Sequence, residues 1–393
     1  MLWQSYVFRR GNDVFEMWDD LFANRPVRLL YITGRGFDLR AQSVLRELVR
    51  SVEYSQPKID KATLLLVEFS AYHISEELRS LTEENGKALA EIFKPIGSVV
   101  SESFNANSAG ESDIGPTSLL RMAAQKILNQ IDEYTDIVLD VSSLPRVAYL
   151  AIMTGILKKI LPDLQRSNAL YAGGVNFQVV VAEDALLDAN IRSEDPRSDL
   201  TLIPGFSEIL HSEAASEWPS VWFPILGERR ASQFEKVWDY IPPSAEICPV
   251  LPHPSRDHRR ADQLLVEYRE LLFERADTPR SNILYAHEAQ PFEAYRQLLN
   301  AMIRYKESLG VLGGCRLLVT PLASKLITLG AGLACFEMQA KADQNSCGVA
   351  MPYVEPTRYS TSMERVRAAK PLVSALLLTG HAYDPSTLEK IQS

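Results

Sequence analysis

Two stretches of the chain place hydroxyl groups and a cation where a predicted strand turns into a predicted helix. They run over residues 135–157 and 315–336. The side chains at the two breaks are Ser142, Ser143 and Arg146 in the first stretch, and Thr320, Ser324 and Lys325 in the second. Free backbone N–H groups at a helix start, the helix dipole and a nearby cation together attract anions. The pattern therefore predicts two anion sites of the kind that hold a phosphate group.

Serine also commonly caps a helix without binding any ligand. Either stretch alone is open to both interpretations. A capping role does not require a cation at the same place twice, so the repetition favours the anion site.

A glycine turn precedes the first of these stretches. The apolar segment 28–33 predicts a buried strand, and a helix follows from residue 41. The residues between them that are candidates for ligand binding are Gly34, Arg35, Gly36, Asp38 and Arg40. A strand, a glycine turn and a helix open a Rossmann-like domain, although the third glycine of the dinucleotide fingerprint is missing. The glycines allow a ligand to approach the backbone, whereas Asp38 could equally serve only as the helix N-cap.

The same plan restarts in the second half of the chain. A strand predicted at 221–226 runs into Gly227 and then a helix, with Arg230 at the point that Arg40 occupies in the first half. A later strand, predicted at 282–287, is followed by Glu288, the best carboxylate candidate for acid–base chemistry in this half.

Strands alternate with helices in both halves, which predicts an α/β fold with mainly parallel sheets. We expect two tandem Rossmann-like domains that arose as a pseudo-duplication. The expected divisions are a domain at 1–186 with a helical lead-in over 1–26, a connector at 187–220 with a short helix near 206–214, and a domain at 221–393 with a closing helix at 361–378. Residues 101–117 are expected to form a loop. Every motif above falls at the carboxyl end of a predicted strand, where such sheets bind ligands.

Cations gather near these predicted strand ends. They are Arg35, Arg40, Arg146, Arg230 and Lys325. We expect them to form one basic cleft, which would attract anions despite the net charge of −9.

The composition is that of a globular protein of 393 residues. The negative charge does not indicate a broad nucleic-acid surface. The four cysteines include no CxxC pair, which fits buried thiols in a reducing cytoplasm. Neither a signal core nor an apolar run long enough for a membrane span is evident, so a cytoplasmic location without a membrane partner is expected.

The second stretch resembles the strand-to-helix motif of CARF domains, the Rossmann-like sensors of cyclic oligonucleotides in prokaryotic antiviral systems. Ser324-Lys325 matches the Thr-Lys of their Thr-Gly-Gly-Thr-Lys pattern, and Gly330-Ala331 matches the small-residue helix. Pro321, Leu322 and Ala323 replace the glycines. The first stretch, at residues 140–146, is a weaker echo. The resemblance covers the core of each half. It implies a nucleotide or cyclic oligonucleotide as ligand, in a sensor subunit that acts with a protein partner or as a homo-oligomer.

Two main functions remain open. The first is a binding module for a nucleotide or another small phosphorylated ligand within a defence or signalling complex. The alternative is an enzyme on nucleotides or sugar phosphates, a hydrolase or transferase. Its candidate groups are His253, His258, His287 and Glu288, but no GxSxG, HExxH or Walker A motif is present. A third reading is a structural partner whose ligand site has decayed.

Overall fold

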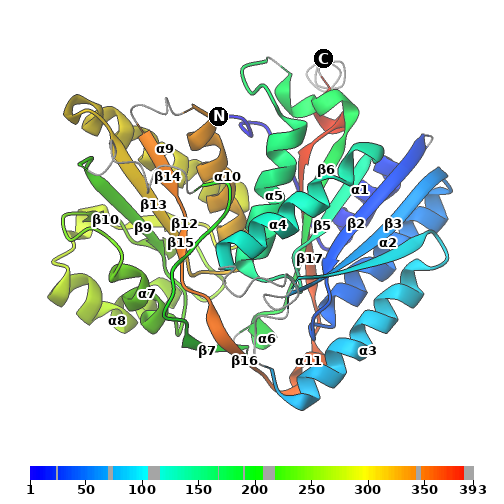
Figure 1. Cartoon of the computed structure of the whole chain (residues 1–393), viewed down its shortest axis with the longest axis horizontal. Helices are drawn as coiled ribbons and strands as arrows, with labels where there is room; N and C mark the ends of the chain where they lie inside the picture. Colours follow the sequence, from blue (N-terminus) through cyan, green and yellow to red (C-terminus); the bar gives the residue numbers. More distant parts are fainter. Residues whose placement is uncertain are drawn as a thin grey trace. The chain divides into compact units, whose positions relative to one another are not determined.

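The computed structural model of the chain describes residues 1–23, 25–69, 74–104, 116–166, 168–188, 191–206, 217–341 and 347–384. The chain divides into two compact units (Figure 1). The first unit comprises Leu2–Glu194 and Thr357–Ser393, and the second comprises Asp195–Pro356 with Met1. The chain leaves the first unit within strand β7 (Arg192–Pro196) and returns within β16 (Pro356–Ser360), and these two strands pair with each other.

A seven-stranded sheet forms the centre of the first unit, in the order β1-β17-β6-β5-β2-β3-β4. Its strands are β1 (Val7–Arg10), β2 (Pro26–Gly34), β3 (Lys58–Phe69), β4 (Ser98–Phe104), β5 (Asp136–Asp140), β6 (Asn176–Glu183) and β17 (Leu372–Thr379). The five strands from β4 to β6 are mutually parallel, whereas β17 runs antiparallel to both β6 and β1. The middle parts of the central strands are buried and apolar, as expected where helices cover both faces of a parallel sheet; they are residues 29–32 of β2, 64–67 of β3, 137–139 of β5 and 179–182 of β6.

The helices of the first unit form two layers. They are α1 (Asn12–Phe22), α2 (Arg40–Ser55), α3 (Glu76–Phe93), α4 (Pro116–Leu128), α5 (Arg146–Ile160), α6 (Ala185–Asp188) and α11 (Met363–Ala368). Helix α2 packs against α1 and α3, and α4 packs against α5 (Figure 1). Apolar residues recur every three or four positions along α2, so one stripe faces the sheet and joins the main core with Trp18 and Phe93.

The second unit is built around a smaller parallel sheet in the order β12-β11-β9-β13-β14, with β10 also paired to β9. Its strands are β9 (Ser220–Ile225), β10 (Glu246–Ile247), β11 (Val250–Pro252), β12 (Leu284–Ala286), β13 (Cys315–Pro321) and β14 (Cys347–Ala350). A separate two-stranded sheet joins β8 (Thr201–Leu202) to β15 (Pro352–Tyr353).

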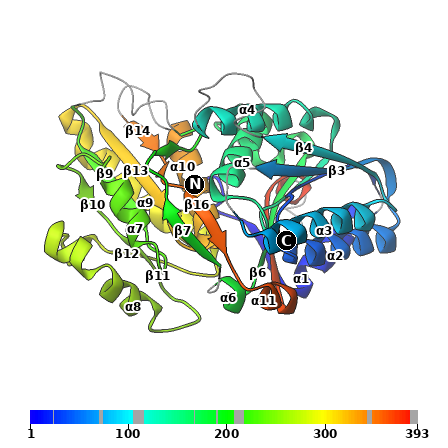
Figure 2. The ribbon, with the colours of Figure 1, turned by 60° about the horizontal axis from the view of Figure 1, so that its bottom comes forward.

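The helices of this unit are α7 (Ala231–Trp238), α8 (Arg260–Glu267), α9 (Pro291–Leu309) and α10 (Lys325–Lys341). Helices α9 and α10 pack closely together (Figures 1 and 2). Gly330 permits this approach, because a Cβ there would lie 2.2 Å from the Pro291 carbonyl oxygen. Helix α10 is buried on all sides from Leu326 to Met338, as expected for a helix that is apolar all round.

The structure confirms an α/β fold with mainly parallel sheets. In both units the parallel strands, numbered along the chain with the short off-path strand β10 left out, lie in the order third, second, first, fourth, fifth. Strands β2 and β5 are the first and fourth strands of the first unit, and β9 and β13 are their counterparts in the second. The point where the strand order reverses therefore lies between β2 and β5, and between β9 and β13.

The expected closing helix at 361–378 is wrong. Only α11 is helical, and after Pro371 the chain forms β17, a buried strand of the first unit. Proline ends the helix, and a short apolar run such as LVSALLLT does not distinguish strand from buried helix by periodicity alone. The expected division placed the last part of the chain in one domain with residues 221–356. In the structure, it packs with the first unit instead.

Two further expectations differ from the structure. The lead-in at 1–26 contains strand β1 before its helix α1, because Val7–Arg10 pairs with β17 from the far end of the chain. Residues 101–104 of the expected loop belong to strand β4, which pairs with β3. Residues 105–115 of that loop, and residues 207–214 of the expected short helix, lie outside the described residues.

Candidate functional site

The predicted site residues divide between the two units. The residues at or just beyond the ends of β2 and β5 in the first unit are Gly34, Arg35, Gly36, Asp38, Arg40, Ser142, Ser143 and Arg146. Arg230, Glu288, Thr320, Ser324 and Lys325 lie at or just beyond β9, β12 and β13 of the second. Both groups are at carboxyl ends of parallel strands, as the sequence predicts. A single cleft shared by all five cations stays a prediction.

In the first unit the loop after β5 fills the space above β2. The Ser143 hydroxyl donates to the Gly34 carbonyl at 2.7 Å. A Cβ atom on Gly34 would lie 2.7 Å from the Ser143 carbonyl oxygen, and one on Gly36 would lie 3.3 Å from the same atom. The two glycines therefore make room for a neighbouring loop of the chain itself.

Asp140 organises this junction, although sequence reasoning did not single it out as a site residue. Its carboxylate is fully buried and accepts hydrogen bonds from the Tyr31 hydroxyl at 2.9 Å and the Ser142 N–H at 2.9 Å. Thr33 adds a longer bond of 3.3 Å. Burial raises the pKa of Tyr31, and the charge of Asp140 raises it further, so the tyrosine stays a neutral donor. The only sequence signal was an aspartate that ends a buried apolar run.

The serines after β5 do not cap α5. The Ser142 hydroxyl accepts from the Ala182 N–H at 2.9 Å, which ties the loop to β6. The N-cap position of α5 is Pro145, which makes no side-chain capping bond. Both hydroxyls are therefore committed to holding the loop.

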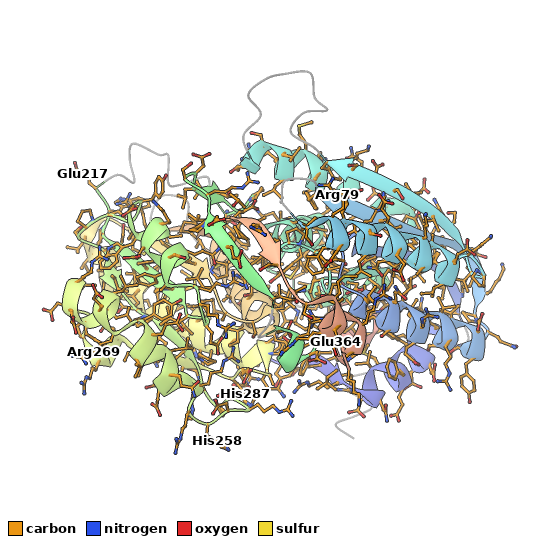
Figure 3. The ribbon with its side chains drawn as sticks, turned by 90° about the horizontal axis from the view of Figure 1, so that it is seen from below. Arg79, Glu217, His258, Arg269, His287 and Glu364 are labelled. Carbon is orange, nitrogen blue, oxygen red and sulfur yellow. The ribbon has the colours of Figure 1, made fainter. Side chains whose placement is uncertain are left out.

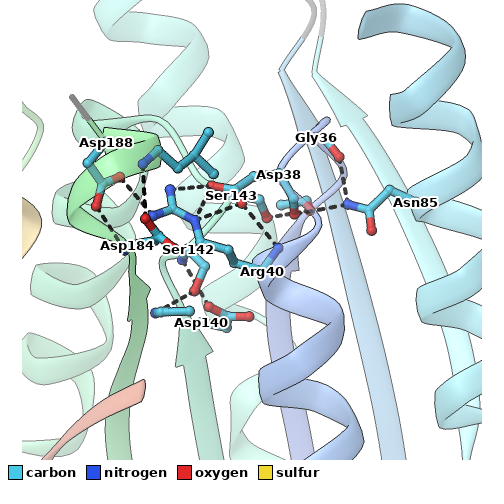
Figure 4. Close-up of polar contacts among 12 residues, drawn as sticks. Gly36, Asp38, Arg40, Asn85, Asp140, Ser142, Ser143, Asp184 and Asp188 are labelled. Atoms are coloured by element: carbon cyan, nitrogen blue, oxygen red, sulfur yellow. Dashed lines mark hydrogen bonds and ion pairs between the residues drawn. The ribbon is translucent and has the colours of Figure 1, made fainter. Parts of the chain in front are cut away.

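Arg40 is also committed within the protein. The guanidinium is 2% exposed, pairs with both carboxylate oxygens of Asp38 and reaches Asp188 at 2.7 Å (Figure 4). Burial lowers the pKa of Arg40, but Asp38 and Asp188 together raise it by more, so the side chain remains charged. Asp38 in addition accepts the Arg40 N–H at 3.1 Å. The pair thus locks the start of α2 to α6.

The remaining polar groups at this edge are acidic or paired. Arg35 forms an ion pair with Glu68 at 3.2 Å, and Asn85 of α3 donates to the Gly36 carbonyl at 2.7 Å. Figure 4 shows the Arg40 guanidinium joined to the carboxylates of Asp38 and Asp188, with Asp140 and Asp184 at the same edge. Carboxylates repel a phosphate group, so this edge of the first unit is unfavourable for an anion.

The second unit repeats one contact of the first. Gly227 follows β9 as Gly34 ends β2, and a Cβ on Gly227 would lie 2.2 Å from the Leu322 carbonyl oxygen after β13. In both units a glycine at the end of the first strand thus meets a backbone carbonyl after the fourth strand.

Gly227→Ala is expected to destabilise the second unit by about 1–3 kcal/mol, because the added methyl group forces two backbone segments apart. The matched control is Gly310→Ala, where a Cβ meets nothing within 4 Å and the backbone is helical. Urea unfolding of both variants checks this expectation. An equal, small effect of the two substitutions would show that the Gly227–Leu322 contact is not tight.

Glu288 is held in an ion-pair cluster beside the loop after β11. Arg260 binds both Glu288 and Glu228, and Glu288 also accepts the Arg256 N–H at 2.9 Å. Burial raises the pKa of Glu228, but hydrogen bonds from Arg260 and its charge lower it by more. Sequence reasoning picked Glu288 alone and missed its partners, since nothing local links residues 228, 260 and 288.

Glu228→Gln is expected to lower stability at neutral pH by at most about 1 kcal/mol, because the pair is partly exposed. A carboxylate with a lowered pKa stabilises the fold above its unfolded pKa of about 4.3, and loses this effect as the pH falls through the folded value. The difference in unfolding free energy between wild type and variant should therefore shrink below about pH 4. Urea unfolding at pH 7 and in acid measures it. A gap that is constant with pH would contradict the assignment.

The start of α10 has polar groups that are shielded from solvent and not hydrogen-bonded. The Ser324 carbonyl accepts the Thr328 N–H at 3.0 Å, which makes Ser324 the residue before the first turn. Within the described part of the chain, neither the Ser324 Oγ nor the Thr328 Oγ1 has a hydrogen-bond partner. Thr328 is fully buried, and Lys325 is partly exposed. Sequence reasoning missed Thr328, which lies one turn along the helix from Ser324.

The neighbouring predicted residues are structural. Thr320 is buried and accepts from the Trp222 indole N–H at 2.8 Å. Arg230 donates to Gln233 at 3.1 Å, and Gln233 in turn donates to the Val354 carbonyl at 2.8 Å. Strand β15 packs against both β13 and α7, so the chain after β14 crosses over the end of β13.

Three histidines were candidate bases of the second unit. His253 and His258 are exposed in the loop after β11, and His287 lies after the neighbouring strand β12, where its Nδ1 accepts the Ala289 N–H at 3.1 Å. Figure 3 shows His258 and His287 at the same edge of the unit. Among the described residues, no group of three or more His, Cys, Asp and Glu side chains is arranged to hold a metal ion.

None of the described helices is both long enough and apolar enough to cross a membrane. Comparison with protein-family models finds no match to this chain, and a search of curated proteins finds none either.

Proposed function

We propose that this chain is a subunit that binds a nucleotide or another small phosphorylated ligand, and that it does so at the start of α10 in the second unit. The observation that carries the proposal is the pair of unpartnered hydroxyls there. Ser324 and Thr328 are four residues apart, so their side chains lie on one face of the helix. A helical Cα–Cβ bond tilts toward the N-terminus, which directs the Thr328 hydroxyl to the same end.

Buried hydroxyls without a partner are costly, by about 1–3 kcal/mol each. A phosphate oxygen accepts hydrogen bonds from two hydroxyls at once and would remove that cost. Because Thr328 is fully buried without a ligand, binding has to part the side chains that cover it. The first N–H groups of α10 and the helix dipole act in the same direction. Lys325 adds a positive charge at the same turn.

The loop after β11 supplies further positive charge to this edge of the sheet. Residues 253–260 include three arginines and one aspartate. Arg256 and Arg259 are exposed, whereas Arg260 is held by Glu228 and Glu288. The first unit has no such excess of positive charge at its strand ends, because carboxylates pair with Arg40. The second unit is therefore the better ligand site of the two.

The equal strand order of the units and the repeated glycine–carbonyl contact support the inference that they arose by duplication. On this account the first unit lost its anion site when carboxylates formed ion pairs with its arginines. The resemblance to CARF domains supports a place in a defence or signalling complex, in which a protein partner or a second copy responds to the bound ligand.

Native mass spectrometry of freshly purified protein tests the proposal. We expect a fraction of the chains to carry a ligand with the mass of a nucleotide or a smaller phosphate compound. Denaturation should release this ligand for identification by its fragments. A ligand without phosphorus, retained at the same site, would contradict the proposal.

A further inference from the structure

Cys315 and Cys347 lie opposite each other on the neighbouring parallel strands β13 and β14, as the first register pair of that ladder. Both thiols are free and buried, and their sulfur atoms are 3.7 Å apart. Paired residues of adjacent strands have Cα atoms about 4.8 Å apart, within the range of about 4.4–6.8 Å that a disulfide spans. A bond between the sulfurs therefore needs only a small movement of two side chains.

The surroundings distinguish the two sulfurs. A hydrogen bond with Cys347 lowers the pKa of Cys315, burial opposes this, and the charge of Lys306 lowers it further. The pKa of Cys347 is raised, first by the hydrogen bond with Cys315 and then by burial. The thiolate is the nucleophilic form of cysteine, so Cys315 is the sulfur that attacks first.

We propose that Cys315 and Cys347 form an oxidisable dithiol, which a hydroperoxide converts to a disulfide between β13 and β14. The Cys315 thiolate attacks one oxygen of the peroxide, an S–O bond forms, and the O–O bond breaks. With hydrogen peroxide, the leaving hydroxide takes up a proton and becomes water. The Cys347 sulfur then attacks the sulfenic sulfur, the S–S bond forms, and the hydroxyl leaves as a second water with the Cys347 proton.

The pair is buried, so an oxidant reaches it only through local opening of the strand ends. Cys315 follows the turn of Gly313 and Gly314, and Val311, four residues before it in the sequence, is 86% exposed. The two cysteines begin their strands at the amino edge of the sheet, opposite the candidate anion site. Strand ends open locally at much lower free energy than the whole unit, and such opening admits a small peroxide.

The other two cysteines lack this arrangement. Cys248 lies 3.1 Å from the Tyr305 hydroxyl, and burial raises its pKa to about 12. Cys335 is in the buried middle of α10, where burial also raises its pKa. In the described residues, neither has a cysteine neighbour within bonding distance.

The test treats the reduced full chain with hydrogen peroxide, then unfolds it, alkylates the remaining thiols and measures its mass. We expect the chain to lose two hydrogen atoms and to keep two of its four cysteines alkylatable. Peptide mapping should find Cys315 joined to Cys347. Four alkylatable cysteines, or a disulfide with a different partner, would overturn the proposal.

Cys315→Ser and Cys347→Ser should each abolish the disulfide, whereas Cys335→Ser should leave it intact. The mapped wild-type peptide decides the outcome even if a serine variant fails to fold. The readout does not involve phosphate, so its result is independent of ligand binding at α10.

Discussion

Arg40→Met is expected to destabilise the first unit by about 3–5 kcal/mol, because it leaves the buried carboxylate of Asp38 without its partner. For a unit of this size the melting temperature should fall by roughly 10 °C. Urea unfolding followed by pulsed hydrogen exchange reports each unit separately. The loss should therefore appear in β2 and α2 and not in the second unit.

Two further variants sharpen this experiment. Arg46→Met on the exposed face of α2 removes a guanidinium without a buried partner and should have little effect. The double variant Arg40→Met, Asp38→Leu removes both charges together, so its loss should be smaller than the sum of the single losses. Strictly additive losses would show that Asp38 does not depend on Arg40. Unchanged stability of Arg40→Met would return Arg40 to the list of ligand-binding candidates.

Lys325→Ala is expected to weaken phosphate-dependent binding by roughly ten- to over a hundredfold, equivalent to about 1.5–3 kcal/mol. Stability should change little, because a cation at a helix start is unfavourable to the dipole and its removal relieves this. Calorimetric titration with inorganic phosphate and with the four ribonucleoside 5′-monophosphates measures the affinity. Lys236→Ala, at an exposed position near the end of α7, is the matched control.

Thr328→Val is expected to change stability and affinity in opposite directions. It replaces an unpartnered buried hydroxyl with a methyl group of similar shape, so the ligand-free protein should keep or gain stability. Affinity should nevertheless fall, because one donor to the phosphate is lost. Unchanged affinity in both Lys325→Ala and Thr328→Val would remove the start of α10 as the site. A large loss of stability in Lys325→Ala would make that lysine structural.

The fold could be predicted from the sequence where apolar strands alternate with amphipathic helices. The strands predicted at 28–33 and 221–226 match β2 and β9 of the structure, since short apolar runs and local turn residues determine them. Strand β1 escaped prediction because it is defined by pairing with a distant segment, as Val7 is paired with Leu377. Strand β4 is mostly exposed and has no buried apolar run, and the apolar run of β17 does not by itself distinguish a strand from a buried helix.

Sequence reasoning placed the candidate residues correctly at strand ends but did not assign their partners. It read Arg40 as a ligand contact because Asp188, its second partner, is 148 residues away. It read Gly34 as room for a ligand, whereas that room is taken by the backbone of Ser143. Ser324 and Lys325 stay predicted ligand contacts. Long-range ion pairs and close backbone approaches become visible only in three dimensions.

Hydrogen exchange of the full chain, with and without saturating adenosine 5′-monophosphate at constant ionic strength, tests the central claim most directly. Binding slows exchange at the amides that contact the ligand and in the elements that it stabilises. We predict slower exchange in peptides that cover residues 322–330, with no change in peptides that cover residues 140–148. Protection at 140–148 without protection at 322–330 would contradict the account and place the site in the first unit.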